Sequence, residues 1–495
     1  MTHELIAAVD LGSNSFRLQI GRIANNQIYP LDGLKESVRL AAGLTPERRL
    51  DAEAQQRGID ALLRFGERLR GFDPASVRAV ATNTLRVAKN AAEFLKKADV
   101  ALGFPIEVIA GHEEARLIFL GVANTLANPQ KRQFVVDIGG GSTEFIIGRN
   151  GDPLCLDSLY MGCVSYSLRF FPGGQVDKRS FKDAEMAARR ELQTMVVAYR
   201  ATGWDQAIGS SGTAKAISDL LVANGHTKEG ISLSGLDWLR SELLRAGDVS
   251  RMRLEGLRSD RLGVLPGGLA IMSAIFKEFG LESMAFSDGA LRLGVLYDQL
   301  DRFHHDDRRD ATVNSFMQRY DVDRRQAARV AHTSMQLFQQ LEPAARQEDH
   351  PDAPFLVWAA RLHETGISIA HSSYHKHGAY ILANADMPGF SRRDQLRMAR
   401  LVLAHRGKVE RAKPMDDEDR DWILLLCLRL AIVLHRSRDD AVLPAMTLSE
   451  PGRHAFRLRF PESTLDALPL TAAALEDEAK QWLNVGRQLT VQYGG

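Results

Sequence analysis

The sequence contains few cysteines, no long apolar run and no leader-like start. Its three cysteines are Cys155, Cys163 and Cys427. Because their number is odd and their spacing matches no metal motif, we expect neither a disulfide framework nor a zinc site. No window reaches about 18 uninterrupted apolar residues, so we expect no integral membrane segment. The start has no basic region followed by an apolar stretch and a cleavage site, which predicts a cytoplasmic protein and leaves peripheral membrane association open.

Net charge is nearly absent as well. The 63 Lys and Arg residues against 62 Asp and Glu give a net charge of +1. This balance argues against a general electrostatic grip on nucleic acid, so we expect no nucleic-acid partner. A polyanion would have to be met by local basic patches. One candidate is residues 391–413, with eight Lys and Arg against Asp394 and Glu410; a solvated face of surface helices is the alternative.

The sequence does contain enough hydrophobic material for several domains. Its 495 residues are 45% hydrophobic and 25% charged, and a chain of this length exceeds what one core usually supports. The first third alternates strand patterns, such as residues 5–10 and 77–82, with helix patterns, such as residues 52–72. This alternation predicts an α/β class. After about Asp301 helical patterns dominate, and strand patterns return only in the tail.

Two segments share one plan. AAVDLGSNSFRLQIG and FVVDIGGGSTEFIIG each read as an apolar strand, an aspartate, a small or glycine-rich turn with a hydroxyl, and a returning strand. Asp10 and Asp137 lie at corresponding positions, 127 residues apart. The match predicts a duplicated domain whose two hairpins face one another across a cleft.

The paired turns predict phosphate binding. Glycine lets backbone N–H groups approach an anion closely, and a neighbouring hydroxyl adds a donor. A further turn in QAIGSSGTAKAISDL lies between a short strand and a helix start. Loose hairpin turns without a ligand are the alternative. The predicted phosphate-binding residues are Gly12, Ser13, Asn14, Ser15, Gly139, Gly140, Gly141, Ser142, Thr143, Ser211, Gly212 and Thr213.

Three carboxylates accompany these turns. Asp10 and Asp137 lie where the strands enter them, and Glu144 lies just beyond the second turn. Carboxylates beside a bound phosphate repel it unless a cation intervenes, so we expect these residues to hold Mg²⁺. Aspartates that cap the turns by bonding to backbone N–H groups are the alternative.

Five motifs together resemble one known family. VDLGSNSF, ATNTLRVA, AGHEEARLIF, VVDIGGGSTE and GSSGTAKAI are similar to the exopolyphosphatase/guanosine pentaphosphate phosphohydrolase family of the actin-like superfamily. The resemblance implies an α/β fold with two actin-like (ribonuclease H-like) domains facing a cleft. A mainly helical HD-like domain with a degenerate metal motif and a small C-terminal α+β lobe follow. The expected boundaries are 1–124, 125–303, 304–440 and 441–495.

The resemblance also implies catalytic roles. It makes Glu114 the base that activates water and Arg86 the residue that grips the phosphate being cleaved. Spacing alone does not choose between Glu113 and Glu114, which point about 100° apart on a helix. Without the resemblance both are the acidic first turn of a helix, stabilised by its dipole. The implied cofactor is Mg²⁺, with a monovalent cation such as K⁺ left open, and the implied assembly is a homodimer.

We expect an exopolyphosphatase that releases orthophosphate from inorganic polyphosphate by Mg²⁺-assisted in-line attack of water. The GGGS turn and the stretches FFPGG and SDGALR favour this branch. One alternative is hydrolysis of guanosine pentaphosphate to the tetraphosphate, and the segment PGGLA, residues 266–270, keeps nucleotide binding open. Another is a sensor that binds polyphosphate or a nucleotide without turnover.

The helical half adds two expectations. His363 is followed by Glu364 where HD-type domains have His-Asp, so we expect a remnant of that fold rather than a working metal site. The basic run could guide a long polyanionic substrate. The residues expected to form this channel are Arg393, Arg397, Arg400, Arg406 and Lys408.

Overall fold

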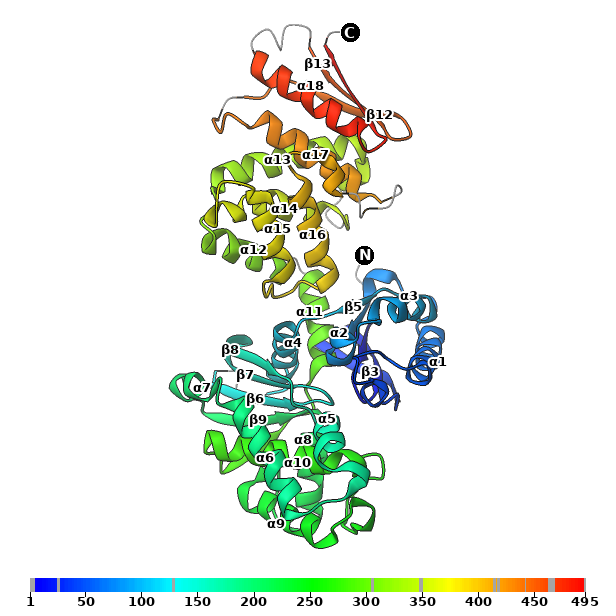
Figure 1. Cartoon of the computed structure of the whole chain (residues 1–495), viewed down its shortest axis with the longest axis vertical. Helices are drawn as coiled ribbons and strands as arrows, with labels where there is room; N and C mark the ends of the chain where they lie inside the picture. Colours follow the sequence, from blue (N-terminus) through cyan, green and yellow to red (C-terminus); the bar gives the residue numbers. More distant parts are fainter. Residues whose placement is uncertain are drawn as a thin grey trace. The chain divides into compact units, whose positions relative to one another are not determined.

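The computed structural model describes residues 5–24, 27–126, 130–303, 307–346, 350–412, 415, 419–440, 442–461 and 468–493. The chain divides into two compact units, Met1–Asp307 and Arg308–Gly495, which we call unit 1 and unit 2. Both are drawn in Figure 1. Each has its own hydrophobic core.

Unit 1 alternates strands and helices, as the α/β expectation requires. Its first half contains β1 (Leu5–Leu11), β2 (Phe16–Ala24), β3 (Gln27–Glu36), α1 (Ala52–Arg68), β4 (Val77–Ala81), α2 (Asn83–Val87), α3 (Ala91–Leu102), β5 (Ile106–Val108) and α4 (Gly111–Ala123). Its second half contains β6 (Gln133–Ile138), β7 (Thr143–Arg149), β8 (Asp152–Leu159), α5 (Cys163–Phe170), α6 (Lys178–Leu192), α7 (Val196–Thr202), β9 (Gln206–Ser210), α8 (Ser211–Ala223), β10 (Ile231–Ser232), α9 (Leu233–Ala246), α10 (Leu265–Phe279), β11 (Ser283–Phe286) and α11 (Leu291–Phe303).

The two sheets of unit 1 confirm the predicted duplication. The first lobe is built on a sheet with strand order β3-β2-β1-β4-β5, and the second lobe on a sheet with order β10-β11-β9-β6-β7-β8. In the first, β1 pairs antiparallel with β2 and parallel with β4. In the second, β6 pairs antiparallel with β7 and parallel with β9. Each lobe therefore begins with an antiparallel hairpin whose turn lies at the end of a central strand.

Burial explains the strand patterns. Every residue of β6 is buried, which accounts for its continuous apolar run between two covered faces. The edge strand β3 is mostly exposed and carries mixed residues. Among the described residues, one stretch, Leu262–Phe279, is long and apolar enough to cross a membrane, but 72% of it is buried inside the protein. It contains α10, which belongs to the core of the second lobe.

Helix α11 comes last in unit 1 but does not stay with the second lobe. It packs against α4 and β1 of the first lobe, and Figure 1 shows it beside α4. Its buried residues Val295 and Leu296 join a core that also contains Ile6 and Leu117. The same core contains Val135 of β6 and Ile146 of β7, so the last helix of unit 1 packs in a core that both lobes share. The chain then continues into unit 2.

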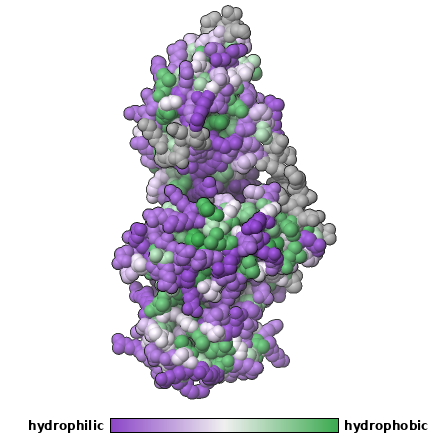
Figure 2. Space-filling model, turned by 90° about the vertical axis from the view of Figure 1, so that its right-hand side faces the viewer, coloured by the Kyte–Doolittle hydropathy of each residue, from purple (hydrophilic) through white to green (hydrophobic). Residues whose placement is uncertain are grey.

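Unit 2 is mainly helical and ends in a small sheet covered by a helix. Its elements are α12 (Arg308–Arg319), α13 (Arg324–Leu341), α14 (Ala353–Leu362), α15 (Tyr374–Asn384), α16 (Arg392–Ala404), α17 (Asp421–Leu434), β12 (Thr447–Gly452), β13 (Ala455–Phe460), α18 (Pro469–Leu483) and β14 (Gln488–Tyr493). The strand order is β12-β13-β14, and α18 precedes β14. The face of the protein drawn in Figure 2 is mainly hydrophilic, with hydrophobic residues in scattered patches.

The fold expected from the sequence is confirmed for both parts: two actin-like domains, then a helical region and a small α+β lobe. The four residue boundaries stay predictions. The structure itself separates two units, with the division between residues 307 and 308.

Candidate active site

The two hairpin turns lie against each other. A Cβ atom added to Gly140 would lie 3.0 Å from the Ser13 Cβ, and one added to Gly141 would lie 2.5 Å from the Asn83 Oδ1. A side chain at Gly141 would therefore clash with Asn83, beside the first turn. The predicted apposition of the two hairpins is thus present, with no side chain to hold them apart.

Amides of neighbouring segments hold the carbonyl groups of both turns. The Arg39 and Ala41 amides donate to the carbonyl oxygens of Asn14 and Ser13, at 2.8 and 2.9 Å. On the other side, the first amides of α5 donate to the carbonyl oxygens of Gly139 and Gly140, at 2.9 and 3.0 Å. Each turn is thereby fixed in shape before any ligand arrives, which lowers the entropic cost of binding.

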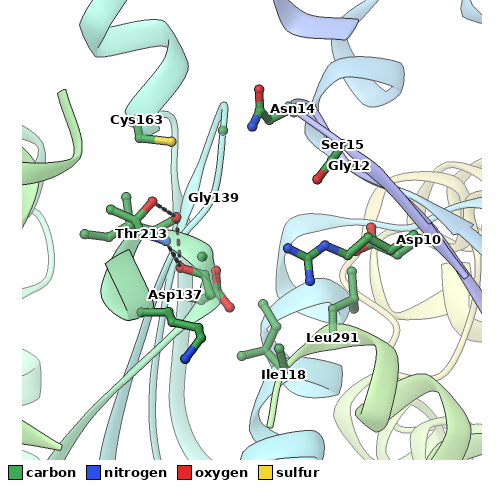
Figure 3. Close-up of a pocket in the computed structure, with 18 of the residues that line it drawn as sticks. Asp10, Gly12, Asn14, Ser15, Ile118, Asp137, Gly139, Cys163, Thr213 and Leu291 are labelled. Carbon is green, nitrogen blue, oxygen red and sulfur yellow. Dashed lines mark hydrogen bonds between the residues drawn. The ribbon is translucent and has the colours of Figure 1, made fainter. Parts of the chain in front are cut away.

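The turns enclose a cavity of about 390 Å³, which we call the interlobe cavity. It is lined by both turns, by the first residues of α8 and by Asp10, Asp137 and Glu114. Figure 3 shows Asp10, Gly12, Asn14 and Ser15 on one side and Asp137, Gly139, Cys163 and Thr213 on the other. The structure therefore gathers residues that are up to about two hundred positions apart in the sequence.

Most of the predicted phosphate-binding residues line this cavity, with one exception. Thr143 is fully buried, and its hydroxyl donates to the Met161 carbonyl at 2.5 Å. The expectation that the Thr143 hydroxyl faces a phosphate is therefore wrong, because it closes β7 against the segment before α5. The residues that do line the cavity are Gly12, Ser13, Asn14, Ser15, Gly139, Gly140, Gly141, Ser142, Ser211, Gly212 and Thr213.

The structure separates the two adjacent glutamates that spacing could not. Glu114 lines the interlobe cavity, and Arg86 Nη1 donates to its Oε2 at 3.1 Å. Glu113 instead accepts two bonds of 2.8 Å from Arg116, away from the cavity. Arg86 also donates to the Ile109 carbonyl at 2.8 Å and lies outside the cavity lining. Arg86 holds Glu114 in this structure, and the phosphate-gripping role that the resemblance implied for Arg86 stays a prediction.

Burial gives Glu114 the protonation behaviour of a general base. Loss of solvent raises its pKa to about 7, partly opposed by Arg86 and reinforced by the charges of Asp10 and Asp137. A carboxylate with a pKa near neutrality can accept a proton from water at physiological pH. The elevated value is also what marks a buried acid as a candidate for function.

The remaining carboxylates differ in their access to the cavity. Burial raises the pKa of Asp10, and it raises the pKa of Asp137 to about 6 although the Ser210 hydroxyl donates to Asp137 at 2.5 Å. Glu144 is paired with Asp137 across the hairpin but does not line the cavity. Its side chain accepts a bond of 2.9 Å from Ser158, and burial raises its pKa well above the ordinary value.

These carboxylates fit a magnesium ion only in part. Among the described residues no three His, Cys, Asp or Glu side chains form a group that could hold a metal. Mg²⁺ in phosphate-transfer sites is usually held by one or two carboxylates together with substrate phosphates. Asp10 and Asp137, which face the cavity from opposite lobes, fit that arrangement. Glu144, expected as a third ligand, lies behind them.

The cavity also collects basic residues that the sequence patterns did not indicate. The cations lining it are Arg17, Lys35, Lys215, Arg258, Arg261 and Arg292. Burial, with the charges of Arg292 and Arg261, lowers the pKa of Arg17 to about 10, while the charge of Asp10 opposes the shift. Guanidinium groups that disfavour one another's charge in this way indicate a site for a bound anion. One signal was present: Arg17 lies at the start of β2, two positions after Ser15 of the first turn.

The predicted channel residues lie in unit 2, and two of them are already paired. Arg397 bonds to Asp421 and Asp352, each at 2.6 Å, and Arg400 lies 3.5 Å from Asp421. Arg406 lies over the Tyr374 ring at 4.7 Å. Arg393 and Lys408 are exposed. The channel stays a prediction, and Lys413 at the end of the basic run lies outside the described residues.

The fold and the site together define a protein of the actin-like class, with two matched turns at a cavity that basic residues line. The chain belongs to the Ppx/GppA phosphatase family. The family model matches residues 19–303, and the model of the family's domain III matches residues 308–479. It is therefore a hydrolase of a phosphatase family.

Known relatives match over almost the whole chain. A protein of Aeromonas hydrophila named guanosine-5′-triphosphate,3′-diphosphate pyrophosphatase is 39% identical, over 97% of this chain and 97% of its own. One of the same name from Pseudoalteromonas atlantica is 40% identical, over 99% and 97%. Among solved structures, an exopolyphosphatase from Cytophaga hutchinsonii is 26% identical with a TM-score of 0.55, covering 60% of this chain and 98% of its own. The Aquifex aeolicus member of the Ppx/GppA family is 25% identical with a TM-score of 0.52, covering 61% and 99%.

Proposed function

We propose that this protein hydrolyses guanosine pentaphosphate at the terminal bond of its 5′-triphosphate, releasing orthophosphate and leaving guanosine tetraphosphate. The observation that carries the proposal is the near full-length similarity, at 39 and 40% identity, to two proteins named for this nucleotide. The sequence alone had favoured inorganic polyphosphate as the substrate. The cations that line the interlobe cavity suit either polyanion, so the preference for the nucleotide rests on the similarity.

The chemistry proposed for Glu114 is that of a general base. An attacking water held at its carboxylate loses a proton to Glu114 as the water oxygen bonds to the terminal phosphorus. The bond from that phosphorus to the bridging oxygen breaks, and guanosine tetraphosphate leaves with the electron pair. Phosphoryl transfer of this kind depends mainly on alignment and charge neutralisation. Arg86, at 3.1 Å, keeps the Glu114 side chain directed into the cavity.

The residues of the two turns would hold the terminal phosphate. Backbone N–H groups of the glycine-rich turn and the hydroxyls of Ser13 and Ser142 are donors of the kind that cradle phosphate. We propose that Asp10 and Asp137 hold Mg²⁺ together with the substrate's own phosphates. The ion would supply neutralisation of the charge on the terminal phosphates. A requirement for K⁺ stays a prediction.

The nucleoside part has to be accommodated elsewhere than the sequence suggested. The PGGLA segment, which had kept nucleotide binding open, forms the buried start of α10. A Cβ at Gly267 would lie 2.5 Å from the Cys163 carbonyl oxygen, so the segment is packed against α5. We propose that the 3′-diphosphate of the nucleotide binds Arg17 of the first lobe and Arg261 of the second lobe. Arg261 packs on the backbone of Gly212, within 2.0 Å of where a Cβ would be.

Exopolyphosphatase activity is a second candidate, supported by the likeness to the Cytophaga hutchinsonii enzyme. Polyphosphate presents the same terminal anhydride but lacks the second phosphate group on a ribose. Both substrates would use Glu114 and the turns, whereas only the nucleotide would need the Arg17 and Arg261 pair.

The deciding experiment compares phosphate release from guanosine pentaphosphate and from inorganic polyphosphate. For Arg17→Gln we expect kcat/KM to fall roughly 10- to 100-fold with the nucleotide, the usual worth of a hydrogen bond to a charged group, and less with polyphosphate. The matched control is Arg245→Gln, an exposed arginine of α9 that pairs with Glu242. Equal losses with both substrates would contradict the nucleotide assignment. Binding of either substrate without release would favour the sensor alternative.

A further inference from the structure

Helices α4 and α11 pack with their backbones in direct contact. A Cβ atom added to Gly294 of α11 would lie 1.7 Å from the Leu117 carbonyl oxygen of α4. One added to Gly121 of α4 would lie 2.3 Å from the Ala290 carbonyl oxygen, at the start of α11. Contacts this short leave no space for any side chain, so the two glycines fix how closely the helices approach.

A buried ion-pair network joins the same two helices farther along. Arg116 of α4 donates to Asp298 of α11 at 2.5 Å and to Glu113 at 2.8 Å. Arg78 of β4 donates to Asp298 at 2.6 Å. Glu107 of β5 and Arg302 of α11 complete the network, bonded to Arg78 and Asp298 at 3.1 Å each. Three arginines thus face three carboxylates, and the charges cancel.

Asp298 is the centre of this network. Burial would raise its pKa, but Arg116, Arg302 and Arg78 hold that pKa well below the ordinary range. Its side chain is 4% exposed, and those of Arg78 and Arg116 are 4% and 7% exposed. Removing one of the fully buried charges that bridge the two helices leaves the others without compensation, which is strongly unfavourable, whereas Arg302 is 20% exposed and pairs within α11. The network therefore holds α4 and α11 in one relative position.

Each helix carries a residue of the interlobe cavity close to these contacts. Glu114 follows Glu113 directly, and neighbouring helical side chains point about 100° apart. When Arg116 clamps Glu113, Glu114 is directed towards the cavity. Arg292 lies six residues before Asp298 on α11, faces the same cavity and comes within 3.9 Å of Asp10. The proposed base and an anion-binding arginine are thus mounted on two helices that are fixed to each other.

We propose that Asp298 is a positioning residue for hydrolysis: through Arg116 and the glycine contact it sets Glu114 and Arg292 at a fixed separation across the bound terminal phosphate. Glu113 takes part as the residue that Arg116 holds on α4, which gives the first glutamate of the EEAR segment a role distinct from that of the base, Glu114. The inference rests on the proposed function and adds to it the residues that align the reacting groups.

The first test replaces the bridging carboxylate and compares it with a change inside one helix. Asp298→Asn keeps the shape of the side chain but removes its charge, whereas Arg302→Gln removes a bond that lies within α11. For Asp298→Asn we expect kcat at saturating substrate to fall roughly 10- to 100-fold, as a small misplacement of a catalytic group does. The fall should be similar with guanosine pentaphosphate and with polyphosphate, because both use Glu114. For Arg302→Gln we expect a kcat within about threefold of wild type, since the bridge between helices remains.

The second test leaves every charge in place. Gly294→Ala forces the helices apart, and we expect the same loss of kcat as for Asp298→Asn. Gly452→Ala is its control, because a Cβ there would meet nothing within 4 Å. All variants are compared at a temperature at which circular dichroism shows them folded. A normal kcat in Asp298→Asn and Gly294→Ala, with only a lowered melting temperature, would overturn the inference.

A readout independent of turnover separates this inference from the proposed function. Hydrogen–deuterium exchange in residues 111–123 should be faster in Asp298→Asn than in wild type and unchanged in Arg302→Gln. Unchanged exchange in Asp298→Asn would overturn the inference even if the protein hydrolyses neither substrate. Absence of hydrolysis by wild type would instead refute the proposed function, and the exchange result would still decide whether the network holds α4.

Discussion

The interlobe cavity of unit 1 and the histidine cluster of unit 2 both bring buried ionisable side chains together, but they treat them differently. In the cavity, Glu114, Asp10 and Asp137 keep raised pKa values because burial outweighs their partners. In unit 2, His363 and His405 lie with ring centroids 5.3 Å apart, and each Nδ1 is bonded to a backbone carbonyl, of Ala360 and Val402 respectively. The carboxylates line a cavity that can admit a ligand. The two histidines instead use one ring nitrogen each in a hydrogen bond to the backbone.

The same contrast applies to the acid beside the histidines. Glu364 is the residue expected in place of the HD aspartate, and Arg438 donates to both of its oxygens, at 2.7 and 2.8 Å. Both oxygens of Glu364 therefore bind the guanidinium group of Arg438, at the position where a metal ligand was considered. Among the described residues no metal-binding group of three side chains occurs here either. The comparison separates a group of carboxylates that lines a cavity from a group of histidines, with Glu364, that is bonded to the chain itself.

The largest effect on turnover is expected from a substitution of Glu114 in the interlobe cavity. Glu114→Gln removes the proton acceptor and keeps the shape of the side chain. We expect kcat to fall by roughly 10²- to 10⁴-fold, the usual contribution of a general base. Substrate binding should persist, because the turns and arginines are unchanged. Phosphate release and equilibrium binding check both points, and turnover close to wild type would assign the base to another residue.

A smaller effect follows from pH. Glu114 acts as a base only when ionised, and its pKa is raised to about 7. Activity should therefore be high above pH 7 and fall about tenfold for each pH unit below it. Asp10→Asn should move this limb to lower pH, because the charge of Asp10 contributes to the raised pKa. A limb near pH 4.5 in wild type would mean that Glu114 is not buried as described.

Stability offers a third test, with a smaller expected change. The folded pKa of Glu114 lies above its ordinary value of 4.5, so its ionisation costs stability that is lost progressively between about pH 4.5 and 7 and is fully lost above about pH 7. Glu114→Gln removes that cost. We expect its melting temperature without ligand to exceed that of wild type by a few degrees at pH 8. The difference should vanish below about pH 4, where the folded and unfolded proteins both carry a protonated Glu114. A lower melting temperature at pH 8 would show that the pair with Arg86 outweighs burial.

The smallest effect on turnover is expected from the histidine cluster. Burial lowers the pKa of His363 below 6.5, so its contribution to stability is complete above that pH and is lost progressively as the pH falls below it. His363→Gln should lower the melting temperature by removing a buried hydrogen bond. It should leave kcat within about twofold of wild type once folding is confirmed. A loss of turnover comparable to that of Glu114→Gln would contradict the claim that the histidine cluster takes no part in hydrolysis.

The sequence predicted the parts of the molecule whose signals are local. Matched strand and turn patterns around Asp10 and Asp137 gave the duplicated hairpins, and glycines identified the surface on which the turns meet. What it could not give depends on tertiary packing. Arg261 reaches the cavity from a loop without a recognisable pattern. Contacts with residues distant in sequence also decide three side-chain positions. Thr143 bonds to the Met161 carbonyl, Glu144 bonds to Ser158 outside the cavity lining, and Arg86 bonds to Glu114.

The choice of substrate was also beyond the sequence patterns, because both candidates end in the same phosphoanhydride. The GGGS turn and Glu114 suit either one. The proposed preference for the nucleotide rests on the similarity to the relatives, and the proposed role of Arg17 and Arg261 in that preference is one that no local pattern indicates. The homodimer and the HD-like assignment of unit 2 stay predictions.

The most direct test of the central claim follows the products formed from guanosine pentaphosphate by the wild-type protein, with binding measured on the same preparation. The account predicts one orthophosphate released per nucleotide and one guanosine tetraphosphate formed, with no pyrophosphate. It also predicts that Glu114→Gln binds the nucleotide and forms neither product at a comparable rate. Tight binding with no product from the wild-type protein would contradict the claim that the interlobe cavity is a hydrolytic site.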